Sequence, residues 1–419
     1  MNISNIIKRK ERGQNLTIEE LSLAFNGYLS EIVIEADMIK LLKAICKKGL
    51  KEEEIISLTE LFIQSGDILD LSNLGITVDK HSTGGVGDKT TLIVAPIVAA
   101  CGVKIAKMSG RALGFTGGTI DKLESIEGFN VSLSKDEFIK QVNDINMAIT
   151  SQTENFCPMD KKIYALRDIS GTTESIGLIA ASVMSKKIAS GASKILIDIK
   201  VGASALIKTK KDAIKLANIM KKIGNIYQKE VICMLTKMDN PLGDNIGNYL
   251  EIKEAIDILQ NKQNTLAYLS IEMATLLVAM GKQITIDEAK IMVTESINSG
   301  KAYDKFLEFV KAQGGVINDI ELMPRTKIFS AKKGFVNKIN GKAIGDTSMK
   351  LGSGRIKKED EIDYFAGVVL NKNVGDKVLK DDLLCTLYGN KKIDTKAIKN
   401  AFNFSNIKPK EQNIIMQII

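Results

Sequence analysis

The chain has 419 residues, of which 44% are hydrophobic and 26% are charged, and its formal net charge is +8. This composition is that of an ordinary folded protein and excludes a disordered or collagenous chain. Lysine is mixed with Glu and Asp throughout, without aromatic residues interleaved in a basic tract, so we expect no nucleic-acid partner. The longest apolar run, residues 92–103, contains Pro96 and is shorter than the roughly 18 residues that suggest a membrane span, so we expect no membrane partner.

The cysteines and the first residues of the chain bear on the compartment. The cysteines are scattered and show no CxxC pair, so the sequence indicates neither a disulfide framework nor a zinc site. They are Cys46, Cys101, Cys157, Cys233 and Cys385. The start, MNISNIIKRKERG, lacks the order of a signal peptide. We therefore expect a cytoplasmic protein with buried thiols.

The first 66 residues are predicted to be helical. Thr17 and Glu20 have the spacing of a capping box, and Gly49 follows a basic turn as a C-cap glycine does. An amphipathic segment then ends at Gly66. Residues 159–190 again have a helical pattern, and we expect them to rejoin residues 1–66 in one all-helical domain.

From Leu74 onward the pattern changes to short β-branched runs that alternate with helical stretches, which is typical of a parallel α/β sheet with crossover helices. The sequence therefore predicts a large α/β domain formed by residues 67–158 and 191–330. After about residue 330, many short β-like runs and turns predict a small C-terminal α+β domain at residues 331–419. The expected fold class is α/β: an all-helical domain, a large α/β domain with a mainly parallel sheet, and a C-terminal α+β domain.

Two glycine-rich loops follow predicted strands, where open α/β sheets bind ligands. The first, DKHSTGGVGDKTT (79–91), is not a Walker-type loop, because Asp88 separates the glycine from the lysine. Its glycines let backbone amides approach an anion, and a helix expected to start near Thr90 favours negative charge. The second loop follows residues 107–111 and reaches Thr119 at another helix start. One such loop alone would suggest an ordinary connection, but the two together predict a site for a small tetrahedral anion.

These loops carry a resemblance to a known family. KHSTGGVGDKTT followed by KMSGRALGFTGGTIDKLES resembles the signature of the thymidine and pyrimidine-nucleoside phosphorylases. The similarity continues through MDKKIYALRDISGTTESIGLIAASVMSKKIASG, DIKVGASAL and MDNPLGDNIGN to GSGRIKKEDEIDYFAG, almost the whole chain. It implies reversible attack of phosphate on a pyrimidine nucleoside (uridine, thymidine or deoxyuridine), which releases free base and a pentose 1-phosphate. It also implies a homodimer paired through the helical domain, and no organic cofactor.

The resemblance also implies which residues form the site. Phosphate would be held by cationic and hydroxyl donors, namely Lys80, Ser82, Thr91, Lys107, Ser109 and Thr119. The nucleoside would be held by Tyr164, Arg167, Ser182 and Lys186. Cations beside the base stabilise the negative charge that develops on the leaving pyrimidine, so Arg167 and Lys186 are expected to be catalytic.

His81 is the only histidine in the sequence. A lone histidine is more often a satisfied surface or core residue. Between Lys80 and Ser82, however, it is predicted to be catalytic, as the group that hydrogen-bonds or protonates the base carbonyl, which suits a pKa near neutrality. Asp160 is expected to orient cationic neighbours, although a carboxylate in the first turn of a helix explains it equally well.

A monovalent cation, K⁺, is a further implication of the resemblance. Its site would comprise Gly87, Lys89, Leu242, Asn245 and Glu254. At Lys89, Leu242 and Asn245 the ligand would have to be the backbone carbonyl. Glu254 is the only carboxylate in the set.

Substrate choice depends on a few positions. Lys107 resembles the broad type of phosphorylase that also accepts ribonucleosides, whereas the alternative, a thymidine-restricted type, usually has methionine there. Ala112, Phe115 and Leu206 depart from the family pattern. They put substrate preference, more than the chemistry, in question.

Two other interpretations remain open. An anthranilate phosphoribosyltransferase-like enzyme has a similar TGGD-type loop, but its chemistry needs an acidic pair to hold magnesium, and residues 190–250 supply no adjacent Asp and Glu. A carrier or regulatory binding protein is suggested by VGDKVLKDDLLCTLY, which resembles the hairpins of biotinyl and lipoyl modules. Such a carrier needs an exposed lysine at a hairpin tip in a recognisable setting, and the sequence does not show one.

Overall fold

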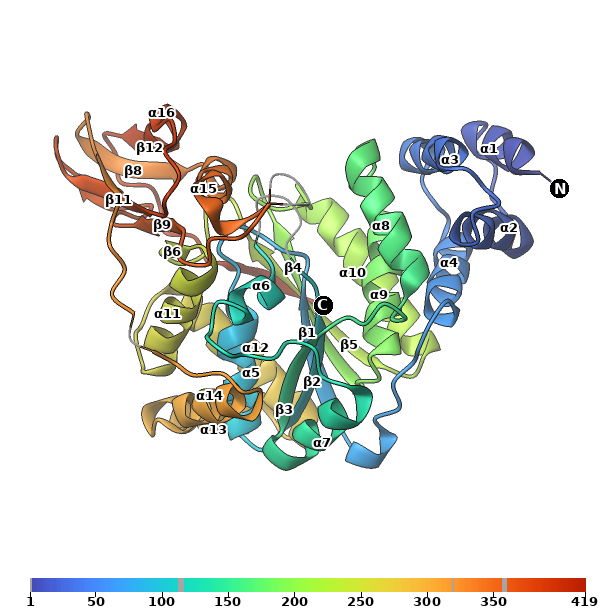
Figure 1. Cartoon of the computed structure of the whole chain (residues 1–419), viewed down its shortest axis with the longest axis horizontal. Coiled ribbons are helices and arrows are strands. Elements are labelled where there is room, and N and C mark those ends of the chain that lie inside the picture. The colour runs from blue at the N-terminus through green and yellow to red at the C-terminus, as the bar shows by residue number, and fades with distance from the viewer. Residues whose placement is uncertain (1, 112–116, 319, 356–359) are drawn as a thin grey trace.

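The computed structural model describes residues 2–111, 117–318, 320–355 and 360–419. Figure 1 shows a central sheet between two outer regions, with the N-terminal helices on one side and the C-terminal strands on the other. The fold class predicted from the sequence is confirmed: a helical region, a large α/β region with a mostly parallel sheet, and a small C-terminal α+β region.

The helical region combines two separate stretches of chain (Figure 1). Its helices are α1 (Ile3–Glu11), α2 (Ile18–Leu29), α3 (Glu35–Lys48), α4 (Glu52–Gln64), α8 (Pro158–Ser170) and α9 (Ile176–Ala189). Helices α8 and α9 pack against α2, α3 and α4 around one apolar core. The predicted capping box is confirmed, because Thr17 and Glu20 each accept from the other's backbone amide. Of the thiols expected to be buried, Cys46 on α3 is exposed and the other four are buried.

The large sheet has six strands in the order β13-β5-β4-β1-β2-β3. The strands are β1 (Thr77–Ser82), β2 (Lys104–Ser109), β3 (Met147–Ser151), β4 (Lys194–Val201), β5 (Glu230–Lys237) and β13 (Ile415–Ile418). Strands β1 to β5 are parallel, and their carboxyl ends therefore lie at one edge. Only β13 runs antiparallel, beside β5.

Helices cover both faces of this sheet. The helices that contact the strands are α5 (Thr90–Ala100), α7 (Lys135–Ile145), α10 (Lys210–Ile226) and α12 (Thr265–Lys282). Outside them, α11 (Asn248–Leu259), α13 (Ile286–Asn298) and α14 (Lys301–Ala312) pack against α5, and a 3-10 turn η1 (Ser72–Leu74) precedes β1. Helix α5 is buried along almost its whole length and contacts α12 and α14, while α10 packs against β5 on the opposite face. Among the described residues, α12 alone is long and apolar enough to cross a membrane, but 67% of its apolar window is buried inside the protein.

The C-terminal region contains two small sheets, ordered β6-β9-β11-β7 and β10-β8-β12. Its elements are β7 (Thr326–Phe329), β8 (Gly334–Ile339), α15 (Gly341–Ser348), η3 (Met349–Ser353), β9 (Gly367–Leu370), β10 (Lys377–Val378), β11 (Leu383–Tyr388), α16 (Lys396–Lys399) and β12 (Phe402–Ser405). Strand β6 (Asn245–Ile246) comes from the α/β part of the chain and pairs with β9.

The last strand, β13, does not belong to the small C-terminal sheets but pairs with β5 of the large sheet. The sequence predicts that residues 331–419 form one domain, but β13 joins the large sheet instead. The physical reason is its apolar character: Met416 and Ile419 pack against the core that β5 shares with the helices. The boundaries between the domains stay predictions.

Candidate active site

Two buried lysines lie on neighbouring strands of the large sheet, near the edge formed by the carboxyl ends of the strands. Lys80 on β1 is 1% exposed, and its Nζ donates to Thr90 Oγ1 at 2.5 Å and lies 3.8 Å from Asp198 Oδ2. Lys107 on the neighbouring β2 is also buried and donates from Nζ to the Lys80 carbonyl at 2.5 Å. Strands inside a parallel sheet are covered on both faces, so charges on them must be paired. This edge therefore holds cations in fixed positions.

Buried carboxylates balance these lysines. Asp79 Oδ2 lies 2.6 Å from Lys187 Nζ, and Asp79 Oδ1 lies 3.9 Å from Lys107 Nζ. Asp198 on β4 lies 2.7 Å from Lys200 Nζ, and it accepts from Thr236 at 2.6 Å. Lysines and carboxylates thus alternate across the sheet edge, and each charge has an oppositely charged neighbour on the same strand, on another strand or on α9.

Asp88, the residue that breaks the Walker spacing, organises the first loop. Its carboxylate accepts from Ser82 Oγ at 2.5 Å and from Thr90 Oγ1 at 2.6 Å, while its carbonyl accepts from Lys122 Nζ at 2.7 Å. Gly84 adopts a φ of +88°, which glycine tolerates best, and its amide donates to Ser82 Oγ at 3.1 Å. Helix α5 then begins at Thr90, as predicted.

Burial and like charges change the pKa values at this edge. The pKa of Lys107 is lowered to about 7, mainly by burial and next by the charge of Lys187. Burial also lowers the pKa of Lys80, against the opposing pull of Asp88 and Asp198. For Asp88, burial acts to raise the pKa, but the nearby lysines and its hydrogen bonds hold it well below the ordinary value. A bound anion would restore the charged form of the lysines.

A second polar cluster lies on α8 and α9. Lys186 Nζ donates to Asp160 Oδ2 at 2.6 Å and to Ser182 Oγ at 2.9 Å. Ser182 and Lys186 are one turn apart and share a helix face, as their spacing predicts. The ring of Tyr164, which is 40% exposed, lies 5.5 Å from Lys186 Nζ. This cluster presents a cation and an aromatic face together.

Arg167 holds the connection between α8 and α9. It is 2% exposed, and its three guanidinium nitrogens donate to the carbonyls of Thr172, Leu178 and Thr173 at 3.3, 3.3 and 2.9 Å. Its guanidinium carbon lies 6.0 Å from the centre of the Tyr164 ring. Arg167 thus holds the turn between α8 and α9 and lies close to the Tyr164 ring.

His81 lies between the two clusters. Its pKa is lowered well below the ordinary value by burial first, and then by the charges of Lys187, Lys107, Lys186 and Lys80. The prediction of a pKa near neutrality is therefore wrong for the free protein, because burial first, and then the charges of lysines from both clusters, disfavour the imidazolium. A neutral imidazole can donate a hydrogen bond, but it cannot act as a strong acid.

The other predicted phosphate ligands lie at the same edge of the sheet. Thr91 is in the first turn of α5, Ser109 ends β2, and Thr119 begins α6 (Thr119–Leu123). Leu206 is partly buried against the core of the helical region. Ala112 and Phe115, whose side chains depart from the family pattern, lie outside the described residues.

Sequence reasoning missed the carboxylates and lysines that pair beneath the site. They are Asp79, Asp88, Asp198, Lys187 and Lys200. One signal was available: Asp198 and Lys200 interrupt an apolar strand two residues apart, and buried charges in such a strand indicate pairing. Lys187 gave no such signal, because its partner on β1 is 108 residues away.

The residues predicted to hold K⁺ do converge, but the side chain of Lys89 occupies their centre. Its Nζ donates to Leu242 O, Asn245 O and Glu254 Oε2. Its own carbonyl, the predicted ligand, accepts from Leu92 N at 2.9 Å in the first turn of α5. These residues therefore do not fit a resident ion. No group of three or more His, Cys, Asp or Glu side chains that could hold a metal occurs in the described part of the chain.

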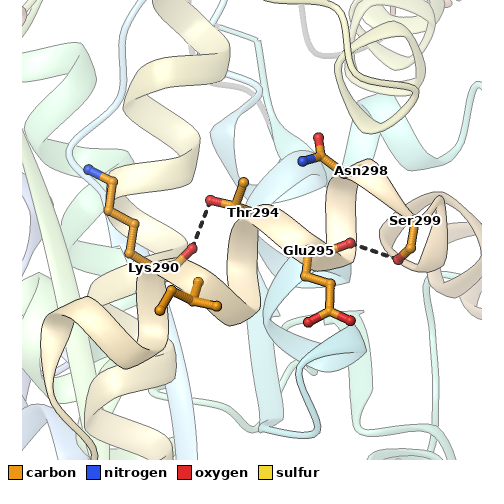
Figure 2. Close-up of a pocket in the computed structure, with 6 residues that line it drawn as sticks. Lys290, Thr294, Glu295, Asn298 and Ser299 are labelled. Carbon is orange, nitrogen blue, oxygen red and sulfur yellow. Dashed lines mark hydrogen bonds between the residues drawn. The ribbon is translucent and has the colours of Figure 1, made fainter.

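A separate hollow of about 580 Å³ lies over α13, away from both clusters (Figure 2). Its lining includes Lys290, Thr294, Glu295 and Ser299. The Thr294 hydroxyl donates to the Lys290 carbonyl and that of Ser299 to the Glu295 carbonyl, each at 2.7 Å. The two hydroxyls are thus used within their own segment, and Lys290 Nζ pairs with Glu272 on α12 at 2.8 Å.

Family comparisons agree with this arrangement. Residues 4–66 match the helical bundle domain of a glycosyl transferase family, and residues 74–303 match its a/b domain. The chain thus has the helical bundle domain and the a/b domain of a glycosyl transferase family. Residues 335–408 match a pyrimidine nucleoside phosphorylase C-terminal domain.

Similar proteins narrow the class further. The chain is 47% identical over 402 residues to a pyrimidine-nucleoside phosphorylase of Staphylococcus epidermidis, covering 94% of this chain and 93% of the relative. It is 46% identical to one of Bacillus subtilis, covering 93% of each. An anthranilate phosphoribosyltransferase structure from Thermus thermophilus matches with a TM-score of 0.57 and 16% identity, over 74% of this chain and 99% of that one, which shows the fold alone. The chain belongs to the pyrimidine-nucleoside phosphorylase family.

Proposed function

We propose that the protein catalyses the reversible phosphorolysis of pyrimidine nucleosides, including uridine, thymidine and deoxyuridine. Phosphate would attack the anomeric carbon with inversion, the glycosidic bond would break, and its electron pair would pass to the pyrimidine. The products would be the free base and a pentose 1-phosphate. The observation that carries the proposal is that α9, which carries Ser182 and Lys186, is joined to the lysine-rich sheet edge by the ion pair between Lys187 Nζ and Asp79 Oδ2, 2.6 Å apart. Relatives that carry this activity in their names support it.

Phosphate would bind at the sheet edge. Lys80 and Lys107 would supply positive charge, while the hydroxyls of Ser82, Ser109 and Thr119 would donate hydrogen bonds, together with Thr91 in the first turn of α5. Because the lysines are already held by buried partners, the nucleophile would be positioned without reorganising the sheet. Binding of an anion would also raise the depressed pKa of Lys107 and keep it charged.

The nucleoside base would lie against Tyr164 with its carbonyl edge toward Lys186 and Ser182. Lys186 would exchange its contact with Asp160 or Ser182 for the base, and its charge would stabilise the departing pyrimidine anion more than the neutral substrate. Arg167 would hold the turn between α8 and α9 and keep the Tyr164 ring in position. The neutral His81 would donate a hydrogen bond to the base carbonyl.

The proposal extends to the compartment and the oligomeric state. We place the enzyme in the cytoplasm as a homodimer, paired through the helical region. Two isoleucines between α2 and α3, Ile32 and Ile34, are 81% and 61% exposed, and a second copy of the chain would bury them. No organic cofactor is required by the proposed reaction.

The test is release of free base from uridine, thymidine and deoxyuridine, each with and without inorganic phosphate. We expect release from all of them only when phosphate is present. Lys186→Ala should lower kcat/KM by about 10²-fold or more, because a donor aimed at the developing charge is lost. His81→Ala should lower kcat/KM by about 10-fold or more, since a neutral hydrogen-bond donor is lost.

Different outcomes separate the alternatives. Release from thymidine and deoxyuridine but not uridine would support the thymidine-restricted enzyme. No phosphate-dependent release from any nucleoside would overturn the proposal. Lys104→Ala is a suitable control, because Lys104 lies at the opposite end of β2 and contacts Leu74 O and Asn143.

A further inference from the structure

The side chain of Lys89 lies where the sequence resemblance implies a K⁺ ion. We propose that its ammonium group is a built-in substitute for a monovalent cation, so that this chain holds its phosphate loop in place without binding K⁺. The inference concerns the surroundings of one buried side chain. It does not depend on which substrate the protein acts on.

The ammonium group is fully coordinated by oxygen. Lys89 Nζ donates to Leu242 O at 3.0 Å, to Asn245 O at 2.8 Å and to Glu254 Oε2 at 2.6 Å. An ammonium has three donors and no acceptor, so these three oxygens satisfy it. Backbone carbonyls are also the ligands that replace the hydration shell of K⁺ in protein sites. The ammonium and a K⁺ ion would therefore compete for the same oxygens.

The charge at this site is already balanced. Lys89 and Glu254 are both buried, and each has a fractional exposure of about zero. The Glu254 carboxylate also accepts from the backbone amides of Asp244 and Asn245, at 2.8 and 2.9 Å. One cation thus faces one carboxylate. A K⁺ ion in addition to the ammonium would leave an uncompensated positive charge in the interior.

The backbone closes tightly around the ammonium. Gly243 has a φ of +75°, and a Cβ there would lie 2.8 Å from Lys89 Nζ and 2.6 Å from Glu254 Oε2. Gly87 has a φ of +76°, and a Cβ there would lie 2.5 Å from Leu242 O. Glycine permits both the left-handed backbone and the close approach. The cradle is therefore built to the size of one ammonium group.

The ammonium joins three parts of the molecule. Lys89 directly follows Asp88 of the phosphate loop and precedes α5. Leu242 and Asn245 belong to the connection between β5 and α11, and Asn245 also begins β6, which pairs with β9 of the C-terminal region. A covalently attached cation is present at every ion concentration, whereas a bound ion stabilises only by mass action. We therefore expect the wild-type fold to be insensitive to K⁺.

The experiment uses the full-length wild-type protein, Lys89→Ala and Lys89→Met. KCl is replaced stepwise by tetramethylammonium chloride at constant ionic strength, because the organic cation is too large for the cradle. Thermal unfolding is followed by circular dichroism, and binding of Rb⁺, as a K⁺ probe, is measured by equilibrium dialysis. Neither measurement requires enzymatic activity.

Each variant has a distinct expected result. Wild type should bind no Rb⁺ at this site and keep the same Tm in both salts. Lys89→Ala leaves Glu254 unpaired and should lower Tm by roughly 5 °C or more in tetramethylammonium. K⁺ should restore that loss in a saturable manner, with about one Rb⁺ bound per chain. Lys89→Met fills the space with an uncharged chain, so it should lose stability without recovery.

Lys10→Ala controls for a general salt effect. Lys10 and Glu54 form another buried pair, 2.7 Å apart and each 2% exposed. Lys10 Nζ is bound to this carboxylate, without the pair of backbone carbonyls that surrounds Lys89 Nζ. We expect Lys10→Ala to be destabilised to the same extent in K⁺ and in tetramethylammonium.

Two outcomes would overturn the proposal. The first is stoichiometric Rb⁺ binding by the wild-type protein, or a wild-type Tm that rises with K⁺ beyond the change seen for Lys10→Ala. The second is a folded Lys89→Ala protein that binds no Rb⁺ and is not stabilised by K⁺. If Lys89→Ala cannot be purified, Lys89→Thr replaces it, because the hydroxyl adds an oxygen to the set and should make the K⁺ dependence easier to detect.

Discussion

The two clusters on either side of His81 are built differently. At the sheet edge, Lys80 and Lys107 are 1% and 3% exposed and are held by groups on α5 and on a neighbouring strand. On α8 and α9, the side chain of Lys186 is 15% exposed and Tyr164 is 40% exposed. The sheet edge is thus fixed by the fold itself, whereas the helical cluster depends on a few side chains that can move. Under the proposed function, phosphate would therefore bind to groups that are already in position, whereas binding of the base would require Lys186 to exchange its contact with Asp160 or Ser182.

Of the substitutions that test this difference between the two clusters, we expect the largest loss of activity from Lys80→Met. The change removes a buried cation that faces Asp198 and deprives Thr90 of its 2.5 Å contact. We expect kcat/KM for phosphate to fall by about 10²- to 10³-fold, as for other lost groups that stabilise transition-state charge. Steady-state kinetics with varied phosphate measure the effect. A fall of less than tenfold, with the Lys104→Met control at wild-type activity, would mean that the sheet edge does not bind phosphate.

A pH titration with Lys107→Met gives an intermediate effect. The pKa of Lys107 is lowered to about 7, so the free wild-type protein loses this charge as pH rises above 7, and KM for phosphate should rise. The variant lacks the charge at every pH. The ratio of the variant's KM to the wild-type KM should therefore fall above pH 7, by up to about tenfold per pH unit. Phosphate's own ionisation cancels in this ratio, and a ratio constant from pH 6 to 9 would exclude Lys107 as the titrating group.

The smallest effect is expected at Tyr164. The centre of its ring lies 5.5 Å from Lys186 Nζ and 6.0 Å from the Arg167 guanidinium carbon. Tyr164→Leu should raise KM for the nucleoside about two- to fivefold, because exposed cation–π contacts contribute about 0.5–1 kcal/mol. Tyr164→Phe keeps the ring and is the matched control, for which KM should stay unchanged. Equal losses in both variants would assign the effect to the phenol hydroxyl instead of the ring.

Much of the fold could be predicted from the sequence, because its signals are local. The capping box at Thr17 and the start of α5 at Thr90 are set by residues close in the chain, and both are confirmed. The alternation of short strands and helices likewise predicted the parallel sheet. The position of β13 could not be read from local pattern, since a short apolar strand fits the edge of any sheet and long-range packing chooses among them.

The site was predictable in its residue types but not in its charge balance. The predicted phosphate residues all lie at the carboxyl edge of the strands, yet their ligand roles stay predictions. The depressed pKa of His81 depends on lysines from β1, β2 and α9, which no local pattern brings together. Lys89 Nζ lies inside the predicted ion site because it binds the oxygens of Leu242, Asn245 and Glu254, which are more than 150 residues away along the chain. A local pattern does not show this placement either.

The position of β13 has a practical consequence for tagged or truncated versions of this protein. The C-terminal region leaves the α/β part before β7 and returns to it at β13, so the polypeptide anchors it at both ends. Deleting the last few residues would free one anchor and uncover the hydrogen-bonding edge of β5, and an uncovered edge invites pairing between molecules. An affinity tag is therefore better placed at the N-terminus, and a C-terminal truncation should be checked for aggregation before its activity is interpreted.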